Sequence, residues 1–160
     1  MSTYRRQQEL LPSLLDRLTD LEPRVRHEAP QTRAQAMRQI RISLRRDLEW
    51  LLNTRRSAEK LPEWMRELRY SLIRYGLPDI NEFSLGSSSD GARLTREIEE
   101  AVELFEPRLT NVMVTMQTRV SGARQLSFSI EALLRVEPAP ERILFDTTLE
   151  MTNGEFRVDE

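Results

Sequence analysis

The stretch Phe105-Glu106-Pro107-Arg108-Leu109 separates two different hydrophobic periods in this chain. Before it, over residues 94–105, apolar residues recur every three or four positions, as they do on one face of a helix. After it, over residues 112–120, apolar and polar residues alternate, as they do in a strand. Pro107 has no N–H for a continuing helix and biases Glu106 away from the α region. We therefore expect a helix that ends at this tripeptide and a strand that follows it.

The two charged residues beside Pro107 have two interpretations. Glu106 and Arg108 could form a binding element, because the proline fixes the backbone between them. They could equally be a solvated pair of charges at a helix end, since surface charges usually need no special explanation. The spacing alone leaves both interpretations open.

The composition points to one globular domain over residues 1–160. Hydrophobic residues make up 39% of the chain and charged residues 31%, which suits a single core with a well-charged surface. The net charge of −2 argues against a broad electrostatic grip on nucleic acid. The absence of cysteine excludes disulfides and thiolate metal sites. Lys60 is the only lysine, and an arginine-rich, near-neutral surface fits protein–protein contact, although codon bias explains it equally well.

The N-terminal residues are polar and no apolar run approaches the length of a membrane span, about 20 residues. We therefore expect a cytoplasmic protein with no signal peptide and no membrane insertion. We also expect residues 1–8 and 153–160 to be candidates for flexible ends.

Three helical patterns precede the tripeptide region. The first is a stripe of five leucines at helical spacing: Leu10, Leu11, Leu14, Leu15 and Leu18. In the simpler interpretation these leucines pack on the chain's own core; in the other they dock a partner helix. A long helix is expected over residues 31–53, where apolar residues recur every four positions. A short helix is expected over residues 64–75, ended by Gly76 as a C-cap. The Ser- and Gly-rich residues 84–92 are expected to form a mobile loop, with Asp90 capping the helix that follows.

The C-terminal part of the sequence is expected to be β. Strand patterns cover residues 112–120, 126–136 and 143–149, and residues 156–158 could add a short fourth strand. Ser121-Gly122-Ala123-Arg124 reads as a hairpin and Asn153-Gly154 as a tight turn. Helices followed by a meander of three to four strands predict an α+β fold with an antiparallel sheet.

The candidates for chemistry are few. His27 is the only histidine, so no second histidine is available to share a metal with it, and no serine is placed to form a triad with it. Glu103 with Glu106, or Asp47 with Glu49, could act as the two carboxylates of a glycosidase. This signal is weak, because acidic residues are common on charged helices and only 6% of residues are aromatic. We expect no enzyme activity, no cofactor and no metal.

Five motifs occur in a fixed order along the chain: residues 12–18 (PSLLDRL), 45–55 (RRDLEWLLNTR), 75–79 (YGLPD), 105–109 (FEPRL) and 145–147 (FDT). In these motifs the chain resembles the TssE family of bacterial type VI secretion baseplates, which is related to the small baseplate wedge protein of T4-like phages.

The resemblance implies a structural subunit of the baseplate wedge that helps to nucleate or anchor the contractile sheath. It implies the partners TssF and TssG, TssK as a further candidate, and the sheath subunits TssB and TssC, which could add a strand to the sheet edge at residues 142–151 or 156–158. It also implies that Glu106, Pro107 and Arg108 form the contact with the wedge partners. The family carries a lysozyme-like label, so a muramidase that cleaves peptidoglycan is the alternative.

For Arg108, a partner contact predicts that alanine leaves folding nearly unchanged. The competing hypothesis is an internal role, in which Arg108 pairs with carboxylates of its own domain.

Overall fold

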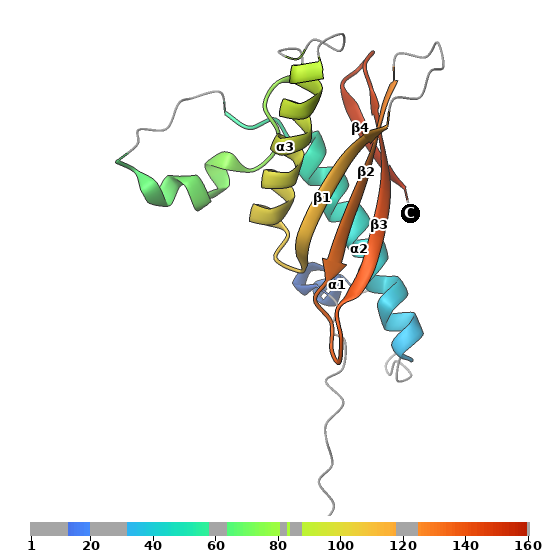
Figure 1. Cartoon of the computed structure of the whole chain (residues 1–160). Helices are drawn as coiled ribbons and strands as arrows, with labels where there is room; N and C mark the ends of the chain where they lie inside the picture. Colours follow the sequence, from blue (N-terminus) through green and yellow to red (C-terminus); the bar gives the residue numbers. More distant parts are fainter. Residues whose placement is uncertain are drawn as a thin grey trace, which may run out of the picture.

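Helices come first in the chain and an antiparallel sheet follows (Figure 1). The computed structural model describes residues 13–19, 32–57, 64–80, 83, 88–117 and 125–159. The helical elements are α1 (Leu14–Leu18), α2 (Arg33–Asn53), the 3₁₀ helices η1 (Arg66–Tyr70) and η2 (Leu72–Arg74), and α3 (Ser88–Phe105). The strands are β1 (Leu109–Gln117), β2 (Gln125–Leu134), β3 (Glu141–Glu150) and β4 (Glu155–Asp159). The predicted α+β class is confirmed, and so are the helix end at Phe105 and the strand after it.

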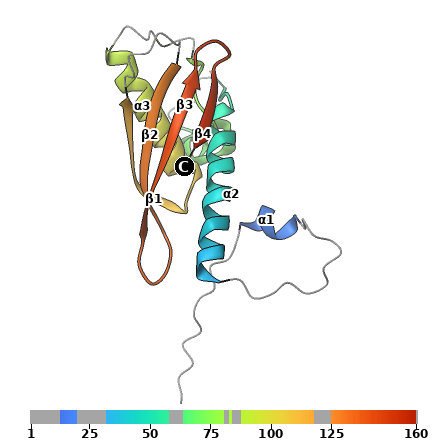
Figure 2. The same ribbon diagram turned by 90° about the vertical axis from the view of Figure 1, so that its right-hand side faces the viewer.

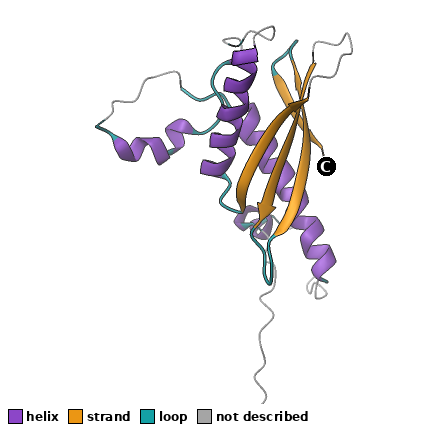
Figure 3. Cartoon of the chain, in the orientation of Figure 1, coloured by secondary structure: helices purple, strands orange, loops and turns teal. Residues whose placement is uncertain are grey.

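The four strands form one sheet in the order β1-β2-β3-β4, with every neighbouring pair antiparallel. Burial alternates along each strand, because successive side chains point to opposite faces. The helices α2 and α3 lie on one side of the sheet (Figures 2 and 3). None of the described helices has the length and apolar character that a membrane span requires.

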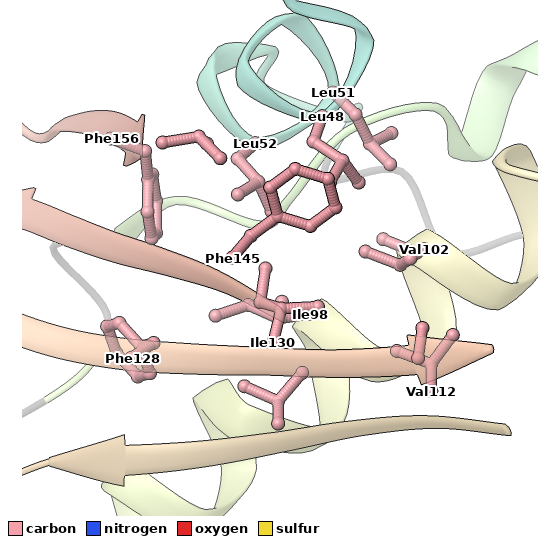
Figure 4. Packing of buried hydrophobic residues seen from close by; sticks show 14 of the residues in the cluster. Leu48, Leu51, Leu52, Ile98, Val102, Val112, Phe128, Ile130, Phe145 and Phe156 are labelled. Carbon is pink, nitrogen blue, oxygen red and sulfur yellow. The ribbon is translucent and has the colours of Figure 1, made fainter. Parts of the chain in front are cut away.

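One hydrophobic core lies between the two long helices and the inner face of the sheet (Figure 4). Each layer contributes large side chains to it: Leu48, Leu51 and Leu52 from α2, Ile98 and Val102 from α3, and Val112, Phe128, Ile130, Phe145 and Phe156 from the strands. The spacing of about four residues in α2 therefore reflects one continuous face against the sheet. Thr32 begins this helix with a capping box, in which its hydroxyl accepts from the Gln35 N–H and the Gln35 side chain accepts from the Thr32 N–H.

A β-bulge shifts the alternation at the start of β1. Asn111 has a φ of 53°, and the register with β2 shifts by one residue between Thr110 and Met113. The extra residue lets both Leu109 and Val112 point into the core, although they are three positions apart.

The segment of residues 64–75 differs from the expected α-helix. It forms the 3₁₀ helices η1 and η2, separated by Ser71, whose ψ of 167° is extended. Of the expected apolar face, Tyr75 packs against the core, but Leu72 is 80% exposed. With the face only partly covered, the segment lacks much of the packing that usually stabilises a helix.

The expected loop over residues 84–92 is wrong from Ser88 onward, where α3 begins. Asp90 lies inside the first turn of α3 and is not its cap. Gly91 lies against β1: a Cβ added there would come within 2.8 Å of the Met116 side chain. The end of the Met116 side chain is able to move, so this contact shows that α3 lies close to β1 here but does not by itself require a glycine.

Two leucines of α1, Leu15 and Leu18, are not in the core. Leu15 is 45% exposed and Leu18 is 83% exposed, so the core interpretation is wrong for these two side chains. At the other end, residues 155–159 form β4 with Phe156 and Val158 buried, and the turn at Asn153-Gly154 is confirmed. Several predictions lie outside the described residues: Leu10 and Leu11, residues 1–8 and 84–87, His27, Lys60 and the hairpin at 121–124.

Candidate functional site

The tripeptide Glu106-Pro107-Arg108 forms a tight turn between α3 and β1. The Glu106 N–H still donates to the Val102 carbonyl at 2.9 Å, and the Leu109 N–H donates to the Glu106 carbonyl at 3.0 Å. The Arg108 carbonyl accepts from the N–H of Arg135, at 2.9 Å, just after β2 ends. The backbone on both sides of Pro107 is therefore fixed by a helix, a turn and a neighbouring strand.

The two charges of the tripeptide bind each other. The Glu106 carboxylate is buried, with 6% of the residue exposed, and both of its oxygens accept from the Arg108 guanidinium. The Arg108 Nε lies 2.6 Å from Oε1, and Nη2 lies 2.5 Å from Oε2. This is the two-point geometry in which arginine binds a carboxylate most strongly.

Helix α2 supplies the remaining partners of Arg108. The Asp47 carboxylate accepts from Arg108 Nη2 at 2.6 Å, and the Ser43 hydroxyl accepts from Nη1 at 3.3 Å. The Ser43 hydroxyl in turn donates to the Ile40 carbonyl. Arg108 thereby ties the turn between α3 and β1 to the middle of α2, which is 61 residues away in sequence.

The network continues to α1 through a second arginine. The Arg46 guanidinium donates to Asp47, at 3.1 and 3.2 Å, and to Asp16 of α1, at 2.8 Å. It also stacks over the Trp50 ring, 5.2 Å from the ring centroid. Asp16 accepts from the Ser13 hydroxyl as well, at 2.6 Å. Alternating charges thus connect α1, α2 and the tripeptide.

The electrostatics of the network follow from partial burial next to carboxylates. Burial lowers the pKa of Arg108, but hydrogen bonds and charge from Glu106 and Asp47 outweigh it and raise the pKa above its usual value. Burial, with the same two carboxylates, raises the pKa of Tyr75. Arg108 is therefore a permanent cation within the protein.

A shallow pocket of about 250 Å³ opens beside this network. Its lining combines charged residues with large apolar ones: Asp47, Trp50, Leu51, Tyr75, Phe105, Glu106 and Arg108. Tyr75 and Phe105 meet edge to face with their ring centroids 5.2 Å apart. Trp50 is 52% exposed, and the Arg108 side chain is 27% exposed. A partner therefore has access to an aromatic surface and to the edge of a fixed guanidinium.

In neither carboxylate pair considered for catalysis do both members border the same one of the two pockets found beside α3. Glu106 borders the pocket beside Arg108, whereas Glu103 borders a different groove on α3. Asp47 binds Arg46 and Arg108, and Glu49 is not part of that network. Both oxygens of Glu106 are engaged by Arg108, so this carboxylate is committed to the network. Among the described residues, no cluster of three metal-ligating side chains occurs.

The sequence did not identify the partners of Arg108. Asp47 was noted only as half of a carboxylate pair, and Ser43 carried no signal. Ser43 does lie among apolar residues on the buried face of α2, between Ile40 and Leu44. A small polar residue on an otherwise apolar helix face was the one available sign of a buried polar contact.

Asp16 should make the docking of α1 dependent on pH. Burial raises its pKa, but bonds from Ser13 and Arg46 outweigh this and lower the pKa below the usual value. A depressed carboxylate pKa stabilises the fold above the unfolded value near 4, and this contribution is lost as the pH falls through the folded pKa. We expect Asp16→Asn to reduce the free energy of unfolding by about 1 kcal/mol at pH 7. Urea unfolding should show the difference from wild type shrinking below about pH 4.

Asp159→Asn, a change at an exposed carboxylate on β4, is the control and should match wild type at both pH values. If the Asp16→Asn difference stays constant from pH 7 to pH 3, the ion pair with Arg46 is not its source.

Comparison with known proteins places the site within a family. A family model described as "Baseplate wedge protein gp25" matches residues 38–139, which is more than half of the chain. Among curated proteins, none matches this chain. One similar solved structure is entitled "The baseplate complex from the type VI secretion system". It shares 22% sequence identity, covers 71% of this chain and 97% of that chain, and has a TM-score of 0.49. The matched region of the family model begins within α2 and contains Ser43, Asp47 and the tripeptide, and the chain belongs to the baseplate wedge protein gp25 family.

Proposed function

We propose that this protein is a structural subunit of the baseplate wedge of a type VI secretion system, as in the TssE family. The observation that carries the proposal is the family match over residues 38–139, which contains the complete Ser43–Asp47–Arg108–Glu106 network. The five sequence motifs, including YGLPD and FEPRL, support the type VI branch of the family. In this role the protein acts in the bacterial cytoplasm by binding partners and without catalysis.

The wedge contact is proposed at Glu106, Pro107 and Arg108. Pro107 is exposed, Arg108 is partly exposed, and the pocket beside them offers Trp50 and Tyr75 as apolar surface. Internal pairing and partner contact are compatible here, because Glu106 and Asp47 hold the guanidinium in place while one edge stays accessible. The partners are the wedge subunits TssF and TssG, with TssK as a further candidate.

Trp50→Ala tests this contact: it removes the ring that Arg46 stacks on but leaves the ion pairs of Arg108 with Glu106 and Asp47 in place. We expect the variant to melt like wild type but to bind TssF and TssG about tenfold more weakly, because exposed aromatic residues often dominate interfaces. Pull-down and calorimetric titration with the co-purified partners measure the effect. Ile42→Ala is the matched control, since Ile42 is 49% exposed on the same helix. If both variants bind the partners equally well, the proposed contact at this pocket is wrong.

The second proposed interface is a sheet edge that accepts a strand from the sheath subunits TssB and TssC. On each of the two outer strands, a side chain already binds the backbone of one residue. On β1, the outward N–H of Val114 donates to the Glu99 carboxylate at 2.8 Å. On β4, the Asn53 amide pairs with both the N–H and the carbonyl of Phe156, each at 2.8 Å, as a neighbouring strand would.

Strand β3 offers the more open edge. Its described pairing with β4 runs only from Asp146 to Glu150, whereas β3 itself begins at Glu141. Phe156 points its N–H and C=O away from β3. Because these groups alternate between the two sides along each strand, the N–H and C=O of Arg142 and Leu144 point toward the side of β3 that β4 does not reach. We place the added strand here, within the expected residues 142–151.

Leu144→Pro should separate folding from sheath assembly. Leu144 is 49% exposed and its N–H points to the open edge, so proline is tolerated in the monomer but removes the donor for an added strand. We expect a folded variant that binds the wedge partners normally but supports sheath assembly at about a tenth of the wild-type level or less, as seen by microscopy of labelled sheaths. Leu144→Ala keeps the N–H and should assemble sheaths. Normal assembly with the folded proline variant would rule out this edge.

A further inference from the structure

A second groove, of about 320 Å³, lies between the 3₁₀ segment and the C-terminal half of α3. Its lining includes Arg56, Tyr70, Arg74, Glu100, Glu103 and Phe105. Phe105 is the only residue that it shares with the pocket beside Arg108. The groove is therefore a separate surface, and the function proposed above does not use it.

The segment that borders this groove, residues 64–74, exposes several large apolar side chains, and one of them, Tyr70, lines the groove together with Arg74. Four large apolar side chains within ten residues are exposed: Trp64 at 76%, Tyr70 at 74%, Leu72 at 80% and Ile73 at 45%. Figure 1 shows this segment, in green, on the far side of α3 from the sheet. Exposed apolar residues that gather in one place commonly mark interaction sites.

The opposite wall carries an excess of negative charge. The two arginines that line the groove already have partners: Arg56 lies 2.8 Å from Glu97, and Arg74 lies 3.8 Å from Glu100. Glu103 is exposed and has no ion pair within the described part of the chain. Glu100 is 67% exposed and its contact with Arg74 is long. A partner that enters the groove therefore meets mainly the negative charge of carboxylates.

We propose that this groove docks an amphipathic helix of a partner protein that carries basic residues beside its apolar stripe. The groove spans Glu100 to Phe105 of α3, about 7.5 Å at 1.5 Å per residue, which accommodates two side chains one helical turn apart. Two apolar anchors pack against Tyr70 and Phe105, and a lysine or arginine beside them meets Glu103. A helix with acidic flanks is disfavoured, because it places like charges against Glu100 and Glu103.

Model peptides test this proposal with the full-length protein. Three fluorescein-labelled peptides of about 18 residues, or five helical turns, share one leucine stripe. The first has lysine flanks, the second has glutamate flanks, and the third has lysine flanks with two central prolines that prevent a helix. By fluorescence anisotropy, we expect the lysine helix to bind at least about tenfold more tightly than either of the others.

Protein variants locate the binding. Tyr70→Ser should weaken binding of the lysine helix about tenfold. The pair Glu100→Gln with Glu103→Gln should remove most of its preference over the glutamate helix. Leu144→Ser and Asp159→Asn are matched controls on the sheet and should bind like wild type. The proposal is wrong if the lysine and glutamate helices bind equally, if the proline peptide binds as well, or if Tyr70→Ser has no effect. It is also wrong if sedimentation shows wild-type dimers that Tyr70→Ser dissociates, because the occupant is then a second copy.

Discussion

Replacing Arg108 by alanine is expected to destabilise the folded protein by about 3–5 kcal/mol, because the buried Glu106 carboxylate then loses the one cation that it binds in the described part of the chain. The Glu106 side chain is 7% exposed, so water does not replace the lost guanidinium. Asp47 also loses one of its two arginines. For a domain of this size, such a loss lowers the melting temperature by roughly 10 °C. Thermal and urea unfolding of the isolated protein measure the effect.

Two variants make this test specific. Arg142→Ala removes another short ion pair, 2.6 Å from Glu131, whose side chains are 69% and 39% exposed, so its melting curve should stay close to that of wild type. Adding Glu106→Gln to Arg108→Ala should recover part of the stability, because the uncompensated charge is then gone. If the melting curve of Arg108→Ala overlays that of wild type, Arg108 serves only a contact with a partner, and the hypothesis of an internal role is wrong.

Replacing Gly76 by alanine is expected to cost about 3 kcal/mol or more, since two independent penalties meet at one residue. Gly76 has a φ of +98°, which side chains rarely adopt. A Cβ there would lie 2.2 Å from the Thr54 carbonyl oxygen, which itself accepts from the Leu77 N–H at 2.9 Å. This bond belongs to a short parallel bridge between Arg55 and Leu77, so relief of the clash would break the bridge. Urea unfolding measures the loss.

Gly154→Ala is the matched control for the clash. Gly154 also has a positive φ, of 70°, but an added Cβ would meet only the end of the Arg55 side chain, which is able to move. We expect about 1 kcal/mol for the backbone penalty alone. If the two alanine variants are equally stable, backbone strain explains the Gly76 effect and contact with Thr54 does not.

The parts of the fold that follow local patterns were predictable from the sequence. Alternation in residues 143–149 predicted β3, since every second side chain there is buried. Pro107 correctly predicted the end of α3 and the change to a strand. The bulge at Asn111 was not predictable, because it depends on the register with β2.

Two misassigned segments have tertiary causes. Residues 88–92 read as a loop because serine and glycine are weak helix formers, yet α3 begins there, where Gly91 packs closely on β1. The segment containing Leu72 had a helical pattern, but the fold covers only part of its apolar face and leaves Leu72 exposed, and only 3₁₀ turns form. In both cases packing outweighed local preference.

Only the local part of the candidate site was predictable from the sequence. Glu106 and Arg108 stand out beside a proline at a change of period, and their interaction is local. Asp47 is 61 residues from Arg108, and nothing in its own surroundings distinguishes it from other helix carboxylates. Long-range pairs of this kind follow from the topology, which a single sequence does not specify.

The pairing of Asn53 with Phe156 has a consequence for the speed of folding. The two residues are 103 positions apart, so the C-terminal end of α2 acquires its strand partner only after a very large loop has closed. Contacts between distant residues slow folding, and α2 carries its apolar face through that interval without the strands that later cover it. We therefore expect a slow folder whose early intermediates expose the leucines of α2, and which depends on chaperones more than its size alone would suggest.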